Sequence, residues 1–164
     1  MAESKEVHST EDRADESEKE RLDRNLEQLL QELRVALPGV QVLFAFLLTV
    51  PFSQGFVKLS DFERDLYFFV LMATAVATVF LISPTAIHRL LFRAGMKREI
   101  VMRSNVLSLI GLAVLAVAMT AAVTLIAHFV LGPTAAVITA IATAVVIVSL
   151  WYALPLGDRL LRDL

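Results

Sequence analysis

Few residues of this 164-residue chain combine a reactive side chain with a position inside a long uncharged stretch. His128 is the titratable group that lies furthest inside one, and an imidazole gains or loses a proton near neutral pH. It would suit a proton relay if an acid folded over it, and the acids of one short polar connection are Asp61, Glu63 and Asp65. His128 also stands one turn before Gly132, so contact with headgroups and water is the alternative interpretation.

Two other polar residues are candidates for a functional role. Gln41 carries an amide that needs hydrogen-bond partners in hydrocarbon, and either a neighbouring helix or an aqueous pathway would supply them. His88 follows Pro84 at the edge of a basic segment, where it would sense cytoplasmic pH. The hydroxyls of the same stretches are expected to bond to a carbonyl one turn back; they belong to Thr49, Thr74, Thr78, Ser108, Thr120, Thr124, Thr139, Thr143 and Ser149.

The sequence contains no pattern that predicts catalysis. It has no G-x-S-x-G, no glycine-rich phosphate loop, no H-E-x-x-H and no histidine–carboxylate cluster with metal-ligand spacing. Cysteine is absent, which excludes a disulfide framework, a thiolate metal site and a thiol nucleophile. We therefore expect no enzyme activity, no cofactor and no metal site.

The hydrophobic content predicts an integral membrane protein. The chain is 57% hydrophobic with a mean hydropathy of +0.67, above the usual range of soluble globules. Uncharged stretches long enough to cross a bilayer lie at residues 35–56, 66–87, 106–131 and 135–154. The last two are divided by Gly132 and Pro133, because glycine ends helices and proline cannot continue them, and Thr134 is expected to cap the next helix. The predicted fold is an all-α, four-helix bundle over residues 35–157.

The N-terminal region is polar and acidic. Residues 1–16 contain almost no large apolar side chains and are expected to form a disordered acidic tail. Residues 17–34 have leucines at helical spacing, which predicts an amphipathic cytoplasmic or interfacial helix with Ser17 and Glu20 as a capping box. Pro38 and Gly39 should bend or break the chain before the first span. Residues 158–164 are expected to form a short cytoplasmic tail.

The distribution of basic residues predicts the orientation. Ten lysines and arginines flank the spans on one side and only Lys58 and Arg64 on the other, so the positive-inside rule puts both termini in the cytoplasm. Aromatic residues should form a belt at the opposite boundary; they are Phe52, Phe56, Phe62, Tyr67, Phe68 and Phe69. The middle connection is expected to form a second interfacial helix or a helical hairpin, interrupted near Gly95. Its basic residues are Arg89, Arg93, Lys97, Arg98 and Arg103.

This basic segment has three interpretations. It sets topology by snorkelling to phosphates, attracts anionic lipids of the inner leaflet, or docks the acidic tail of the same chain. No aromatic platform accompanies the charges, so nucleic-acid binding is not expected. Small residues at four-residue spacing, Ala136, Ala140 and Ala144 in the last span and Ala118 and Ala122 in the third, favour close helix packing inside the chain, or alternatively in a homo-oligomer.

Two segments carry a resemblance to a known family. LPGVQVLFAFLLTVPFSQGF, Leu37 to Phe56, and SPTAIHRLLFRAG, Ser83 to Gly95, resemble an uncharacterised family of small actinobacterial membrane proteins that is known as a domain of unknown function. The similarity extends from about Leu22 to Leu160. It implies a four-span protein of the bacterial plasma membrane, and it implies no activity, cofactor or catalytic residue.

Two functional hypotheses follow from these observations. The first is a non-enzymatic accessory, scaffold or stress-related membrane component, which would use the leucine-rich helix and the basic segment to meet lipids or a membrane protein partner. The alternative is a small oligomeric channel or transporter with a passage lined by Gln41 and the threonines. The absence of charged residues inside the spans disfavours a transporter driven by an intramembrane carboxylate.

Overall fold

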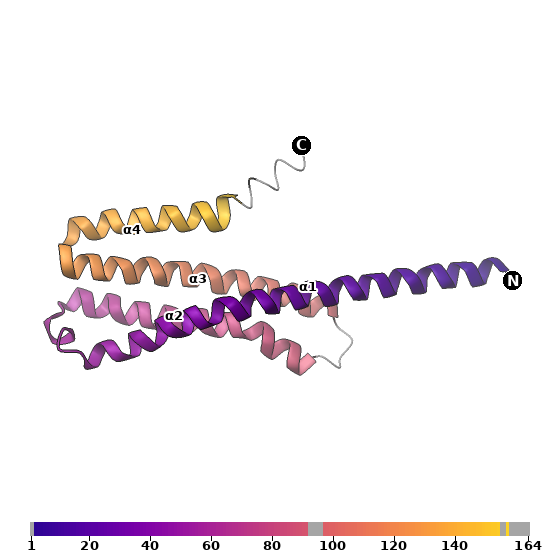
Figure 1. The fold of residues 1–164 in the computed structure, drawn as a ribbon, viewed down its shortest axis with the longest axis horizontal. Helices are drawn as coiled ribbons and strands as arrows, with labels where there is room; N and C mark the ends of the chain where they lie inside the picture. The colour runs from indigo at the N-terminus through magenta and orange to yellow at the C-terminus, as the bar shows by residue number, and fades with distance from the viewer. Residues whose placement is uncertain (1, 92–96, 155–156, 158–164) are drawn as a thin grey trace.

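The computed structural model describes residues 2–91, 97–154 and 157, with side chains for 20–90, 99–154 and 157. Four helices make up most of it: α1 (Ala2–Thr49), α2 (Asp61–Leu91), α3 (Lys97–Leu131) and α4 (Pro133–Val148). Two short 3-10 turns, Val50–Phe52 and Phe56–Lys58, link α1 to α2, and a π-helical turn, Ser149–Ala153, extends α4 (Figure 1). The described residues include no strand, and the all-α prediction is confirmed.

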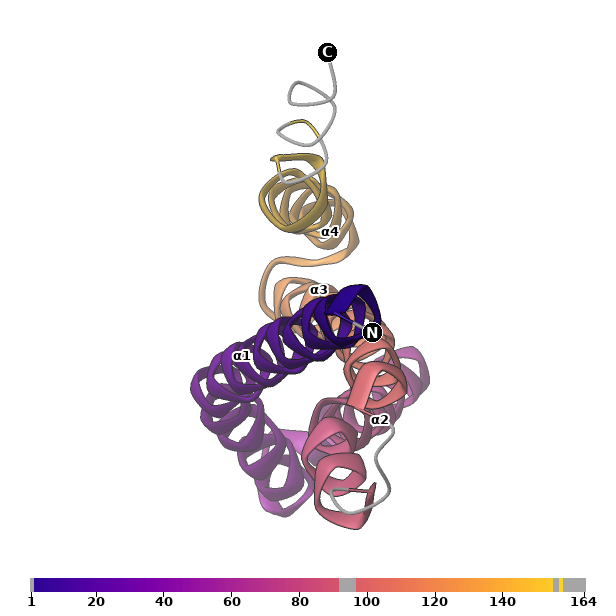
Figure 2. The ribbon, with the colours of Figure 1, turned by 90° about the vertical axis from the view of Figure 1, so that its right-hand side faces the viewer.

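α1 differs from the sequence prediction in four respects. It is one helix of 48 residues that begins at Ala2, so it includes the segment expected as a disordered tail and the helix expected to start at Ser17. Ser17 therefore lies inside the helix and not at its start, where a capping residue stands. The helix also continues through Pro38 without a break. Proline removes only one donor, whereas unfolding the helix would leave many backbone groups unpaired in an apolar setting. Figure 2 shows that α1 instead changes direction along its length.

The buried face of α1 repeats every seven residues. Leu26, Leu33, Val40 and Leu47 are each 8% exposed or less. A seven-residue repeat keeps one seam facing its neighbours in supercoiled helices. Leu33 and Val40 pack in one cluster with Ala77 and Leu81 of α2 and Leu115 of α3, and Leu29 packs against this cluster. The leucine face that was expected to be a working surface is therefore largely used inside the molecule.

α2 and α3 pack against each other most extensively. Gly111 permits their close approach, because a Cβ at this position would lie 2.9 Å from Cγ of Leu81. The expected interfacial helix between the second and third spans is replaced by the ends of these two helices: Arg89 lies in α2, and Lys97, Arg98 and Arg103 lie in α3. Arg93, Gly95 and the expected tail at 158–164 lie outside the described residues.

The turn between α3 and α4 confirms one prediction and corrects another. Gly132 has φ of 92°, a conformation that glycine adopts without strain, and Pro133 is the first residue of α4. Gly132 itself is the capping residue and no side chain caps the helix, so the expected role of Thr134 is wrong. α4 lies on the far side of α3, and no Cα of α4 lies within 8 Å of α1 or α2 (Figures 1 and 2).

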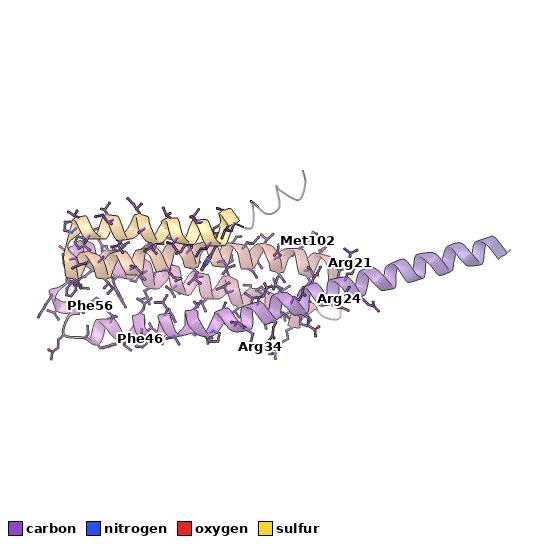
Figure 3. The ribbon with its side chains drawn as sticks, turned by 45° about the horizontal axis from the view of Figure 1, so that its top comes forward. Arg21, Arg24, Arg34, Phe46, Phe56 and Met102 are labelled. Atoms are coloured by element: carbon purple, nitrogen blue, oxygen red, sulfur yellow. The ribbon has the colours of Figure 1, made fainter. Side chains whose placement is uncertain are left out.

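Each of the four helices is long and apolar enough to cross a membrane. The apolar segments are Glu20–Phe52, Asp61–Leu90, Glu99–Leu131 and Pro133–Ala153. Figure 3 shows Arg21, Arg24 and Arg34 spread along α1 toward its N-terminal side, with Phe46 and Phe56 toward the opposite end of the molecule. We call the end that holds residues 50–60 and Gly132 the turn end, and the end that holds Arg89 and Arg103 the basic end. The fold is compatible with a multi-pass membrane protein.

Candidate functional site

A histidine–carboxylate pair lies at the turn end. Nδ1 of His128, near the end of α3, is 2.9 Å from Oε1 of Glu63, in the first turn of α2. The two side chains are 26% and 8% exposed, respectively. The ring of Phe62 lies against the imidazole with a centroid separation of 5.2 Å. One of the three acids that the sequence offered as partners for His128 therefore does reach it.

Glu63 is held in place by the start of its own helix. Ser60 precedes the first residue of α2, and its backbone N–H and hydroxyl donate to Oε2 of Glu63 at 2.8 and 2.9 Å. The backbone N–H of Glu63 points back to the Ser60 hydroxyl at 3.4 Å. This is a capping box, in which a serine and a glutamate three residues later satisfy each other's free amides. The same S-x-x-E spacing occurs in the sequence at Ser60, whereas the sequence prediction names only the capping box at Ser17.

Glu63 therefore makes two contacts at once: one carboxylate oxygen caps α2, and the other lies within hydrogen-bond distance of His128. A proton can be held between the imidazole and the carboxylate, and Phe62 covers one side of the ring. Among the described residues, no three histidine or acidic side chains are grouped closely enough to hold a metal ion. The pair therefore offers a proton-binding contact and a connection between α2 and α3.

The other two histidine and amide candidates lie elsewhere. His88 is in the last turn of α2, which places it at the basic end, whereas His128 is at the turn end. Gln41 is exposed on the outside of α1, and within the described part of the chain its side chain makes no hydrogen bond. The three polar candidates do not form one site.

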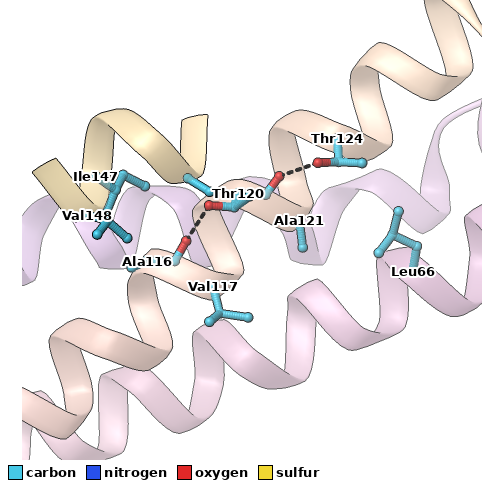
Figure 4. A pocket seen from close by; sticks show the side chains of 9 residues that line it. Leu66, Ala116, Val117, Thr120, Ala121, Thr124, Ile147 and Val148 are labelled. Atoms are coloured by element: carbon cyan, nitrogen blue, oxygen red, sulfur yellow. Dashed lines mark hydrogen bonds between the residues drawn. The ribbon is translucent and has the colours of Figure 1, made fainter. Parts of the chain in front are cut away.

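Most hydroxyls inside the helices bond to their own helix, as the sequence predicts, but among the described residues the hydroxyls of Thr143 and Ser149 make no hydrogen bond, so the prediction is wrong for these two. Thr74, Thr78, Ser108, Thr120, Thr124 and Thr139 each donate to the carbonyl four residues earlier, at 2.7 to 2.9 Å. Figure 4 shows two of these bonds, from Thr120 and Thr124, beside an apolar groove of about 400 Å³ between α2, α3 and α4. These hydroxyls use their donors inside the helix and offer none to a passage.

The regularly spaced small residues of the last span pack against another helix of the same chain. Ala136 is 4% exposed, Ala140 and Ala144 are half-buried, and all three lie on the face of α4 that meets α3. The facing residues of α3 are also small and include Ala116, Thr120 and Thr124, which line the groove with Ala144. Close approach of backbones through small residues is how helices associate without a hydrophobic driving force.

The described residues of the basic segment are exposed. Arg89 points outward from the last turn of α2, and Arg103 is 64% exposed with a 3.3 Å ion pair to Glu99. Figure 1 shows the N-terminal end of α1 projecting away from this end of α2 and α3, so the acidic tail does not cover the described residues of the basic segment. Arg93 and the side chains of Lys97 and Arg98 lie outside the described residues.

The aromatic belt is only partly as predicted. Phe52, Phe62, Phe68 and Phe69 are between 50% and 90% exposed at the turn end. Tyr67 is 4% exposed and packs edge-on against Phe56 in the core, with ring centroids 5.3 Å apart. Its hydroxyl donates to the carbonyl of Leu47 at 2.7 Å. Periodicity does not reveal this contact, because it joins residues 20 positions apart on two helices.

Comparisons with known proteins support a family assignment and nothing narrower. No curated protein and no solved structure matches the chain. A family model described as a family of unknown function, DUF6328, matches residues 15–155, which includes all four apolar helices from residue 20 of α1 onward. The chain therefore belongs to the DUF6328 family of unknown function.

Proposed function

We propose that this protein is a non-enzymatic component of a bacterial plasma membrane, an accessory, scaffold or stress-related protein that acts by association. In this arrangement four helices cross the bilayer, the basic end and both termini are cytoplasmic, and the turn end is outside. The ten-to-two bias of lysine and arginine supports this orientation. The exposed arginines of the basic end would meet phosphates and anionic lipids of the inner leaflet.

The length of α1 is the observation that carries the proposal. A helix of 48 residues extends about 72 Å at 1.5 Å per residue, whereas the hydrocarbon core is about 30 Å thick. Asn25 and Leu29 line a groove with Val101 and Met102 at the start of α3, so α1 runs beside α3 at this level. The part before it projects beyond the other helices as a helical arm, residues 2–19 (Figure 1).

The charge of the arm indicates the kind of partner. Residues 2–19 carry seven acidic and three basic side chains. An acidic helix in the cytoplasm fits a basic protein surface, and complementary charge speeds association and sets specificity. The leucines at positions 26, 29 and 33 are packed internally, so a partner would meet the arm and not the leucine face.

One observation weighs against the alternative of a channel or transporter. Most of the threonine hydroxyls that would line a passage donate to carbonyls of their own helices.

The test compares the full chain with a variant that neutralises four acids of the arm: Glu11→Gln, Asp12→Asn, Asp15→Asn and Glu16→Gln. Native mass spectrometry of the protein extracted from its own membranes should show a stoichiometric complex with the full chain and loss of the complex with the variant. A control with Lys5→Gln, Arg13→Gln and Lys19→Gln should keep it. A complex that survives acid neutralisation contradicts the proposal, as does solute flux through the purified full chain in vesicles without any complex.

A further inference from the structure

Gln41 is a polar side chain on the outside of an apolar helix. It stands seven residues after Arg34, which places it about 10 Å along the axis from the last charged residue of α1. It is exposed, and within the described residues it has no hydrogen-bond partner. An amide surrounded by hydrocarbon without partners is costly, and a glutamine side chain is too short to reach water over this distance.

The surface around Gln41 is shaped for a close helix contact. Pro38 and Ala45 lie three residues before and four residues after it, on the same side of α1, and both are exposed. Both are compact, so another helix can approach the backbone closely. Pro38 also has no N–H to donate, so the carbonyl of Arg34 lacks its usual α-helical donor on this side of the helix.

We propose that this face of α1, formed by Pro38, Gln41, Ala45 and Leu48, is the interface between two copies of the chain in a parallel, two-fold dimer. All copies insert in the same orientation, so equivalent residues lie at equal depth and meet around an axis normal to the membrane. An amide both donates and accepts, so Gln41 of each copy satisfies Gln41 of the other. A different protein would have to supply a matching polar group at this depth, whereas a second copy supplies it by symmetry.

This dimer is independent of the proposed partner of the helical arm, because only this chain is needed to form it. Gln41 and Ala45 lie outside the core, so substitutions there leave the intramolecular packing of Leu33, Val40 and Leu47 intact. The chain contains no cysteine, so single cysteines report on single positions.

The experiment places one cysteine at Ala45→Cys, on the proposed interface, and in a separate chain at Phe46→Cys, the adjacent residue at nearly the same depth. Phe46 is 68% exposed and points to the other side of α1. Oxidation in vesicles of the purified chain should cross-link Ala45→Cys to a dimer and leave Phe46→Cys monomeric. Adding Gln41→Leu to Ala45→Cys should raise the protein-to-lipid ratio at half-maximal cross-linking roughly three- to twentyfold, and Gln41→Asn should largely restore it.

Three results in vesicles of the purified chain would overturn the proposal. They are equal cross-linking at positions 45 and 46, no cross-linking at position 45, or a midpoint that Gln41→Leu does not move. Cross-linking of Ala45→Cys in native membranes to another protein, in place of a second copy, would also overturn it. The thermal unfolding midpoint of each variant, measured in the same detergent, should match that of the parent chain.

Discussion

At the scale of single residues, Tyr67 supplies a hydrogen bond that Pro51 cannot make. The carbonyl of Leu47 would accept the N–H of residue 51 in a continuing helix, but proline has none. The Tyr67 hydroxyl donates to this carbonyl at 2.7 Å from a buried position on α2. The bond thus compensates for the proline that ends α1 and ties this end to α2.

Removing the hydroxyl of Tyr67 should therefore reduce the stability of the fold. We expect Tyr67→Phe to lower the free energy of unfolding by about 1 kcal/mol, because it leaves the Leu47 carbonyl unpaired. Denaturant unfolding in detergent, followed by circular dichroism, measures this change. Tyr152→Phe is the matched control, since the Tyr152 hydroxyl is buried and has no hydrogen-bond partner among the described residues, and its removal should cost nothing. Equal losses in the two variants would contradict this assignment.

Substitution by alanine should change the free energy of unfolding differently at two glycines that lie in helices. A Cβ at Gly111 would lie 2.9 Å from Leu81 side-chain atoms and 3.1 Å from Cβ of Phe80, whereas a Cβ at Gly39 meets nothing within 4 Å. Gly111→Ala should lower the free energy of unfolding by about 1–3 kcal/mol by forcing α2 and α3 apart. Gly39→Ala should keep it or raise it by up to about 1 kcal/mol, because alanine favours the helix. The same unfolding assay distinguishes them, and a tolerated Gly111→Ala would argue against the close crossing.

At the scale of elements, Glu63 joins the start of α2 to the end of α3. It is the one side chain that both completes the capping box with Ser60 and meets His128. Loss of Glu63 removes both contacts, loss of His128 removes one, and neither contact involves Asp65.

This arrangement predicts an order of stabilities. Glu63→Ala should lower the thermal unfolding midpoint more than either Ser60→Ala or His128→Ala, and Asp65→Ala, an exposed acid of the same helix turn, should lower it least. Differential scanning fluorimetry in one detergent compares all four variants. A midpoint for Glu63→Ala no lower than that for Asp65→Ala would show that the two contacts do not stabilise the turn end.

Two glycine–proline pairs show where local sequence predicts a helix end and where it does not. Gly132 followed by Pro133 marks a helix end, because the glycine takes a positive φ and the proline starts the next helix, and both effects are local. Pro38 followed by Gly39 has the same residue types in the opposite order, and there α1 continues. Burial of Leu33, Val40 and Leu47 on one seam keeps the helix intact through the proline, and this packing is not visible in local sequence.

The candidate site was predictable only in part. The sequence identified His128 and three acids, one of which is its partner, but could not choose Glu63, because the choice depends on how α2 packs beside α3. The outward position of Gln41 likewise depends on which face of α1 meets α2 and α3. The hydroxyl bonds were predictable, since each is made within four residues of the same helix.

At the scale of the whole molecule, α1, α2 and α3 pack together, and of these three described helices only α3 comes within 8 Å of α4 between Cα atoms. α1 is the longest element and leaves the others at the basic end, where its acidic arm extends outward (Figure 1). In the proposed orientation this arm is cytoplasmic, and it carries the functional proposal. If the basic end were outside, the arm would face away from any cytoplasmic partner.

The orientation of the chain in the membrane is therefore the claim to measure. Because the chain contains no cysteine, single introduced cysteines can measure it directly. Single cysteines at Gln54→Cys in the α1–α2 connection, Ser9→Cys in the arm and Glu99→Cys at the start of α3 are treated with a membrane-impermeant maleimide. In intact cells only Gln54→Cys should be labelled, and Ser9→Cys and Glu99→Cys should react only after permeabilisation. Labelling of Glu99→Cys or Ser9→Cys in intact cells, with Gln54→Cys protected, would contradict the account.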